Sequence, residues 1–162
     1  MSRATRRAAF GVAVLLLLLT ASTRAQGSRA FIVALQGNAN PVPTEDPCVL
    51  VNTETATGWS PGIGALVWES REEVNLCAGP DGADIQGEFT ITVANGDRLS
   101  GTYRTLGQLD IATNRISARG RYRIAAGTGA FAGASSEGLL GAEGSLLPPF
   151  EFTGVLFGNI SF

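Results

Sequence analysis

Apolar and polar residues alternate along most of this chain, and glycines interrupt the alternation at short intervals. All but one of the 21 glycines lie after residue 25, where no segment carries the 3.6-residue apolar stripe of an amphipathic helix. Neighbouring side chains of an extended strand point to opposite faces, so the pattern predicts short strands with one buried face. Such strands, separated by closely spaced turn signals, are typical of an all-β barrel or sandwich.

The first 25 residues have the organisation of a secretory signal peptide. Three arginines precede any acidic residue, an unbroken apolar stretch runs from Ala8 to Leu19, and the small residues Thr23 and Ala25 suit signal-peptidase cleavage. A membrane-spanning helix needs about 20 apolar residues, and this stretch is much shorter. We therefore predict a signal peptide over residues 1–25, a single domain over residues 26–162 without a membrane anchor, and a secreted or periplasmic location.

Removal of the signal peptide makes the remaining chain clearly acidic. The whole chain has 12 basic and 14 acidic residues, and four arginines but no acidic residue precede residue 26. Eight basic residues then face 14 acidic ones, which gives a net charge of −6. Such a domain has no electrostatic reason to bind nucleic acid or an anionic membrane, so neither is an expected partner. The sequence does not indicate an oligomeric state.

The two cysteines, Cys48 and Cys77, are predicted to form a disulfide. An exported protein folds in an oxidising compartment, where cysteines can pair. The bridge would close a loop of about 30 residues and stabilise the fold by ~3–4 kcal/mol in the chain-entropy model. Two buried free thiols remain the alternative, because spacing alone does not show that the two Cα atoms come close enough.

The clearest local prediction is a β-hairpin. Phe89, Ile91 and Val93 alternate with polar residues, a short turn follows, and a second alternating strand passes through Tyr103. The turn is formed by Asn95, Gly96 and Asp97, and an Asn-Gly pair supplies the positive φ angles that a tight hairpin turn needs.

A second clear strand runs from Arg115 to Ile124. Tyr122 and Ile124 share one face with small residues, whereas Arg119, Arg121 and Arg123 share the other. A row of three arginines cannot face a dry core without partners. The tyrosine face is therefore predicted to point inward and the arginine face outward.

The remaining segments are predicted with less regular patterns. Strands are expected over residues 30–36, 48–51, 65–77, 135–144 and 150–162, with a bend or bulge within the charged run 69–73 of the third. Residues 37–46 are predicted to form a loop or an edge because prolines remove ladder donors. Residues 53–63, rich in Thr and Gly, are predicted to form a second loop, and residues 79–82 a turn.

These segments amount to seven or eight strands in mostly local order. A sheet of that size tends to close, because closure removes exposed edges. The predicted fold is therefore an antiparallel barrel of about eight strands, whose interior holds side chains or one small ligand. A β-sandwich is the alternative.

Two segments resemble a known group of proteins. Ala94–Tyr103 and Gly127–Ala134, the second with turn glycines Gly127 and Gly129, resemble motifs of secreted bacterial proteins of the allene oxide cyclase barrel-like, or dirigent-like, group. The resemblance covers roughly residues 83–162; the N-terminal half matches poorly, and Ala126 stands where the group usually has a further glycine. It implies an eight-stranded barrel with a central cavity. Some relatives cyclise hydrophobic small molecules or steer their coupling without a cofactor, but the matching residues are structural, so no functional residue can be transferred.

The residue inventory excludes several kinds of chemistry. The chain has no histidine and no lysine, which excludes Ser-His-Asp triads, Cys-His pairs, histidine metal sites and Schiff-base chemistry. Any general acid or base must be Asp, Glu, Tyr or water, and neither a metal nor a cofactor is predicted. The acidic group Glu69, Glu72 and Glu73 lacks a calcium-loop pattern and is interpreted as a solvated face.

Three aromatic residues are the candidates for ligand contacts. Trp68, Tyr103 and Tyr122 either line a cavity or simply pack in the core, and their polar tips seek partners when buried. The leading hypothesis is a non-catalytic exported barrel that binds a small apolar molecule or a partner. A cofactor-independent cyclase or coupling-guiding protein is the alternative, and assembly through an exposed edge or the arginine row is a third.

Overall fold

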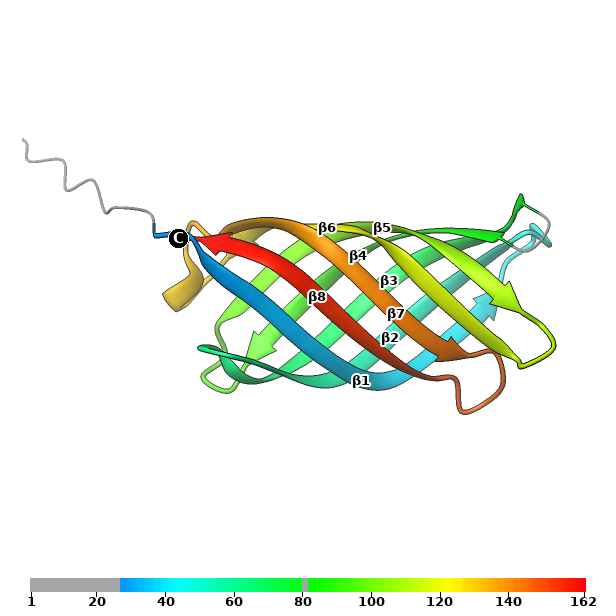
Figure 1. The fold of residues 1–162 in the computed structure, drawn as a ribbon, viewed down its shortest axis with the longest axis horizontal. Helices are drawn as coiled ribbons and strands as arrows, with labels where there is room; N and C mark the ends of the chain where they lie inside the picture. Colours follow the sequence, from blue (N-terminus) through cyan, green and yellow to red (C-terminus); the bar gives the residue numbers. More distant parts are fainter. Residues whose placement is uncertain (1–26, 80–81) are drawn as a thin grey trace, which may run out of the picture.

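The fold is a single closed antiparallel barrel of eight strands, seen in a computed structural model that describes residues 27–79 and 82–162 (Figure 1). Each strand pairs with the next along the chain, and the last strand pairs with the first. The elements are β1 (Arg29–Pro43), β2 (Val49–Ser60), β3 (Gly64–Gly79), β4 (Gly82–Val93), β5 (Arg98–Asp110), β6 (Arg115–Gly127), a 3-10 turn η1 (Gly129–Phe131), β7 (Ser135–Ser145) and β8 (Glu151–Ser161). The predicted barrel is confirmed, and the sandwich alternative is wrong. The predicted signal peptide lies outside the described residues.

The alternation of side chains along each strand produces the inside and the outside of the barrel. Along β6, Tyr122 and Ile124 are buried, whereas Arg119, Arg121 and Arg123 are exposed. The arginine face therefore points outward, as predicted. Closure pairs nearly every strand on both sides, so assembly through an exposed edge loses its main basis.

Residues 37–46 were predicted to form a loop or an edge; the loop is wrong for most of its length, because β1 continues to Pro43, and the edge agrees with the structure. Pro41 pairs with Asn52 and Pro43 pairs with Leu50 on β2. The pairing of β1 with β8 ends at Asn38, so the proline-containing end has a neighbouring strand on one side only. A strand tolerates proline in such a position, since no ladder hydrogen bond is lost on the free side.

The second predicted loop, residues 53–63, is also wrong, because β2 runs through most of it. Its inward positions carry small or polar residues such as Asn52, Ala56 and Ser60, while threonines face outward. Without large apolar residues the alternation is hidden in the sequence. In the described residues of β3 the register stays regular from Leu66 to Asn75 and shifts only between Asn75 and Gly79, so the bend predicted at 69–73 is misplaced.

The predicted hairpin between β4 and β5 is confirmed, but its turn works differently. Only Gly96 has a positive φ, of 87°. Asn95 contributes through its side chain instead, because its Oδ1 accepts a hydrogen bond from the Asp97 amide at 3.0 Å. This is an Asx turn rather than a left-handed Asn-Gly pair. Of the turn predicted at 79–82, Pro80 and Asp81 lie outside the described residues.

The two segments that carry the family resemblance meet in space. The Asp97 carboxylate accepts a hydrogen bond from the Ala130 amide at 2.9 Å, and Thr128 Oγ1 accepts one from the Arg98 amide at 2.9 Å. Gly129 has a φ of 58°, and a Cβ there would collide with the Asp97 carboxylate. The turn glycine is therefore required where η1 folds against the β4–β5 turn, at the end of the barrel that holds the C-terminus (Figure 1).

The interior next to this end is packed with aromatic and aliphatic side chains. Trp68 stacks on Phe89 with ring centroids 4.5 Å apart, and Tyr122 lies 6.5 Å from Phe89 and 6.0 Å from Phe31. Tyr122 fits because its register partner on the neighbouring strand β7 is a glycine: a Cβ at Gly138 would be 2.7 Å from the tyrosine ring. Large rings and glycines on neighbouring strands thus fill this half of the barrel together.

A disulfide bond lies at the opposite end of the barrel, as the sequence predicted. Cys48 and Cys77 are bonded, with their Cα atoms 5.3 Å apart, and they join the start of β2 to the end of β3. In the part of the chain that the structure describes, no helix is long and apolar enough to cross a membrane.

Candidate functional site

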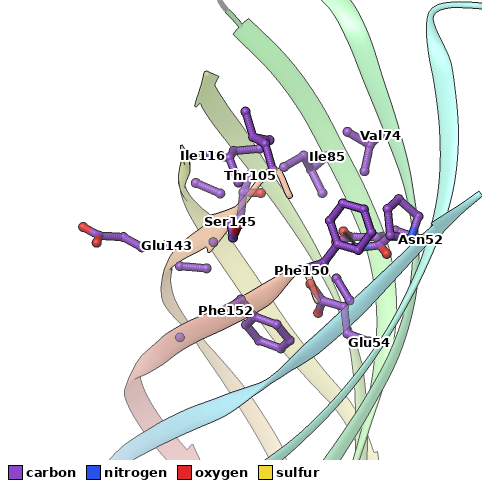
Figure 2. A pocket seen from close by; sticks show the side chains of 18 of the residues that line it. Asn52, Glu54, Val74, Ile85, Thr105, Ile116, Glu143, Ser145, Phe150 and Phe152 are labelled. Carbon is purple, nitrogen blue, oxygen red and sulfur yellow. Dashed lines mark hydrogen bonds between the residues drawn. The ribbon is translucent and has the colours of Figure 1, made fainter. Parts of the chain in front are cut away.

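A cavity of about 320 Å³ occupies the half of the barrel farthest from η1. Its depth is lined by apolar side chains from six strands, and its outer part by residues of the β5–β6 and β7–β8 loops. In Figure 2, Asn52, Glu54 and Val74 lie along one wall, and Ile116 and Ser145 along the other. The deep apolar lining includes Leu35, Val74, Ile85, Ala118, Leu140 and Phe152.

Small inward residues on three strands leave room for the cavity. On β6 the inward series passes from Ile124 and Tyr122 in the packed half to Ala118 in the cavity. On β7 and β8, Gly144 and Gly154 occupy inward positions at the cavity end. A Cβ at Gly154 would meet its nearest atoms at 3.7–3.8 Å, which is ordinary van der Waals contact, so the position tolerates a side-chain carbon without a clash.

A strained loop residue stands at the outer part of the cavity. Phe150 lines the cavity and has a positive φ of 54°, which is rare for an aromatic residue. Backbone hydrogen bonds hold it there: its amide donates to Leu147 O at 2.9 Å, and its carbonyl accepts from the Ala39 amide at 3.0 Å. Such conformations persist only where the surroundings enforce them, and they cluster at binding sites.

One buried carboxylate lies on the cavity wall between β2 and β5. Glu72 on β3 is only 8% exposed; it accepts a hydrogen bond from Asn52 Nδ2 at 2.7 Å and one from the Tyr103 hydroxyl at 2.5 Å. Glu72, Gly87 and Tyr103 are register partners on three successive strands. A Cβ at Gly87 would lie 2.8 Å from the Tyr103 ring, so the missing side chain on β4 lets the phenol reach across to Glu72.

A second carboxylate, Glu54 on β2, lines the same cavity. Its Oε2 accepts hydrogen bonds from Ser70 Oγ at 2.8 Å and from Trp68 Nε1 at 3.3 Å. Both donors come from β3, where Ser70 is the register partner of Glu54. The two carboxylates thus occupy neighbouring inward positions and share a network of side chains from β2, β3 and β5.

Burial and mutual repulsion shift the protonation of this network. Burial, and next the charge of Glu72, raise the pKa of Glu54 from 4.5 to about 7, against the hydrogen bonds from Ser70 and Trp68. Burial also raises the pKa of Glu72, although Tyr103 and Asn52 offset part of the effect. Burial and both carboxylates raise the pKa of Tyr103, which therefore stays a neutral donor. The site changes its charge near neutral pH.

The third carboxylate at the cavity, Glu143 on β7, is different. Figure 2 shows its side chain pointing away from the cavity, and it lies 3.4 Å from an Arg115 guanidinium nitrogen on the outside. Among the residues described for this protein, no arginine lines the cavity. The negative charge of Glu54 and Glu72 therefore has no fixed cation opposite it.

The side chain of Asn52 has a buried polar atom without a hydrogen-bond partner among the described residues. Asn52 is 7% exposed and lines the cavity; its Nδ2 donates to Glu72, but its Oδ1 has no hydrogen bond to the described residues. A buried acceptor without a donor is unfavourable by roughly 1–3 kcal/mol. Such an atom next to an open cavity is suited to accept a hydrogen bond from a bound molecule.

The structure brings together two of the three aromatic residues predicted for the site. Trp68 and Tyr103 line the cavity and hold its carboxylates, so each is both a core and a lining residue. Tyr122 does not line this cavity: it lies in the packed half, where its hydroxyl is 3.1 Å from Ser136 Oγ. The predicted turn residues Asn95 to Asp97, Gly127 and Gly129 lie at the opposite end.

Sequence reasoning missed the polar residues of the site. Glu72 was assigned to a solvated acidic face; this is wrong for Glu72, whereas Glu69 and Glu73 are exposed. Glu54 and Asn52 fell in a segment predicted as a loop. The available signal was the strict alternation of β3, in which Glu72 shares the face of Trp68 and Val74.

Two searches of the described residues and of known proteins found nothing similar or metal-binding. Within residues 27–79 and 82–162, no three Cys, Asp or Glu side chains are grouped so that they could hold a metal ion. Comparison with family models, with curated proteins and with solved structures found no match. The resemblance to the allene oxide cyclase barrel-like group therefore stays a prediction, and function has to be inferred from the geometry of the cavity.

Proposed function

We propose that this protein is an exported barrel that binds a small, largely apolar molecule in the cavity at the disulfide end. The observation that supports this most directly is the cavity itself, which has about 320 Å³ of space and an apolar lining with a few buried polar groups. Ligand pockets have this composition, and this volume lies at the lower end of their range, roughly 300–1,000 Å³. The expected ligand is correspondingly small.

The construction of the barrel supports a preformed binding site. The packed half fixes the strands, and the disulfide joins β2 to β3 near Leu50 and Leu76, which both line the cavity. A rigid site loses less conformational entropy when a ligand binds. The disulfide also fits the oxidising environment that export would provide.

Fluorescence titration tests this proposal. The probe is N-phenyl-1-naphthylamine, an apolar fluorophore that is uncharged at neutral pH, and the protein is the mature chain. We expect a saturable increase in emission with a stoichiometry of one. Ala118→Phe fills the cavity from β6 and should abolish binding, whereas Ala126→Phe places the same side chain on the exposed face of that strand and should not.

The fold of both variants is checked by near-ultraviolet circular dichroism. Equal binding by a folded Ala118→Phe protein and the wild type would show that the probe does not occupy the cavity. Absence of saturable binding to the wild type, both by this probe and by neutral aliphatic alcohols of different lengths, would refute the proposal as a whole.

A specific observation favours a second candidate, a cofactor-independent cyclase or coupling-guiding activity. The pKa of Glu54 is raised to about 7, which suits a general acid or base at neutral pH. Molecules extracted from the source cells and bound by the protein can be incubated with it and followed by mass spectrometry and chromatography. Conversion by the wild type, with binding but no conversion by Glu54→Gln, would favour catalysis; recovery of the bound molecule unchanged would favour simple binding.

A further inference from the structure

The polar groups of the cavity present acceptors to a bound molecule, while most of their donors are already used. Trp68 Nε1 and Ser70 Oγ donate to Glu54, and Asn52 Nδ2 and the Tyr103 hydroxyl donate to Glu72. Both hydrogen bonds to Glu54 end on Oε2, so Oε1 has no protein donor among the described residues. Asn52 Oδ1 has none either. Of the two other hydroxyls in the lining, that of Ser145 donates to Leu147 O at 2.9 Å, and that of Thr105 can donate or accept.

The charged groups of the cavity, like its free hydrogen-bond acceptors, favour a particular kind of ligand. Its titratable side chains are Glu54 on β2, Glu72 on β3, Tyr103 on β5 and the outward-pointing Glu143 on β7. No basic side chain of the described strands or loops lines it. Buried carboxylates without a cation are unfavourable, because desolvation is not offset by an opposite charge. A ligand that brings a positive charge would supply what the protein lacks.

We infer that the ligand is a cationic amphiphile, a protonated amine attached to an apolar chain or ring, with the ammonium group held between Glu54 and Asn52. This inference rests on the proposed function, because it names the class of ligand for the same cavity. Asn52 and Glu54 are two positions apart on one face of β2, so their Cα atoms are about 6.6 Å apart. An ammonium group has three N–H donors and can bond Glu54 Oε1 and Asn52 Oδ1 together. The apolar body then lies against the Leu, Ile and Phe side chains of the lining.

Three probes with the same apolar body separate the chemistry of the head group. Decylamine, decanol and decanoate, each below its micellar concentration, are titrated at pH 8 into the mature protein carrying Trp59→Phe. Trp59 is 57% exposed, so its removal leaves Trp68 in the cavity wall as the single reporter tryptophan. Because charge-assisted hydrogen bonds are the strong ones, decylamine should bind about tenfold or more tighter than decanol. Decanoate should bind most weakly, since it adds a third negative charge.

The result distinguishes this inference from the proposed function. If none of the three probes binds, the cavity is not an apolar binding site and both fail. If decanol binds and decylamine binds no tighter, the proposed function stands and the cationic ligand is refuted. Preferential binding of decanoate would refute it as well.

A pair of matched variants tests whether the ammonium group binds at Glu54. Glu54→Gln keeps the size of the side chain but removes its charge, and should reduce the preference for decylamine over decanol at least fivefold. Glu151→Gln makes the same change on the exposed start of β8, outside the cavity lining, and should keep the full preference. An unchanged preference in the Glu54 variant would place the ammonium group elsewhere. The three-probe series on the Trp59→Phe protein with Glu54 intact remains decisive if the Glu54 variant fails to fold.

Discussion

The two halves of this barrel have the same strand alternation but opposite interiors. Near η1 the inside is filled by Phe31, Phe89, Tyr122 and Ile124, all at most 3% exposed. Near the disulfide the inward positions carry smaller residues, and polar groups gather around an open space of about 320 Å³. One pattern thus produces a packed core at one end and a candidate site at the other.

The difference shows that a side chain can point into the barrel without being apolar. In the packed half an inward position is filled by a large apolar side chain or by a glycine that makes room for one. In the open half, inward positions hold Asn52, Glu54 and Glu72, whose desolvation weakens the fold. Natural proteins keep such groups mainly where function needs them. The comparison predicts that stability depends mostly on one half and binding on the other.

Phe31→Ala tests the packed half and should have the largest effect. Phe31 is 1% exposed, and removal of a fully buried ring destabilises proteins by about 3–5 kcal/mol. Ligand affinity of the molecules that stay folded should not change, because Phe31 does not line the cavity. Urea unfolding and probe titration measure the two quantities. A small stability loss combined with a large affinity loss would reverse the assignment of roles to the two halves.

Removal of the disulfide tests the rigidity of the open half. The bridge between Cys48 and Cys77 spans 29 residues, and its loss should destabilise the fold by ~3–4 kcal/mol in the chain-entropy model. Ligand affinity should also fall, since the strand ends that it joins carry Leu50 and Leu76 of the lining. The double variant Cys48→Ala/Cys77→Ala is compared with the wild type by urea unfolding and probe titration. Unchanged affinity would show that the cavity does not need the bridge.

The packed half was far easier to predict from the sequence than the open half. The hairpin turn after Phe89 and the inward face of Tyr122 follow from alternation and turn residues. These signals are local, and large apolar residues reinforce them. The N-terminal half lacks that reinforcement, because the inward side of β2 carries Asn, Glu and Ala.

The candidate site could not be predicted because its defining contacts are between strands. Nothing in the sequence shows that Gly87 lies between Glu72 and Tyr103 and lets them bond, since that depends on the register of three strands. The charged run 69–73 was misinterpreted for the same reason: composition indicates a solvated segment, whereas alternation buries Glu72 and exposes its neighbours. A strict inside–outside assignment for β3 would have placed this one carboxylate in the interior.

Glu54→Gln tests whether the protonation of a carboxylate in the open half changes the stability of the fold, while the packed half stays the same. Folding raises the pKa of Glu54 from 4.5 to about 7, which corresponds to roughly 3 kcal/mol. The protonated form is favoured in the fold, so this contribution is complete below pH 4.5 and is lost as the pH rises to about 7. The neutral glutamine does not titrate. The variant should therefore gain stability relative to the wild type by about that amount between pH 4 and pH 8 in urea unfolding; a constant difference over this range would contradict the raised pKa.

Removal of single tyrosine hydroxyls gives the smallest effects and the most direct comparison of the two halves. Tyr122→Phe removes one hydroxyl contact with Ser136 in the packed half and should lower the free energy of unfolding by about 1 kcal/mol, without affecting ligand affinity. Tyr103→Phe removes a donor from Glu72 instead, so the pKa of Glu72 should rise further. Because this pKa change acts inside the cavity, the pH dependence of amine binding should move upward in Tyr103→Phe and stay in place in Tyr122→Phe. Identical pH profiles of amine binding in the two variants would mean that the hydrogen bond between Tyr103 and Glu72 does not control the charge of the site.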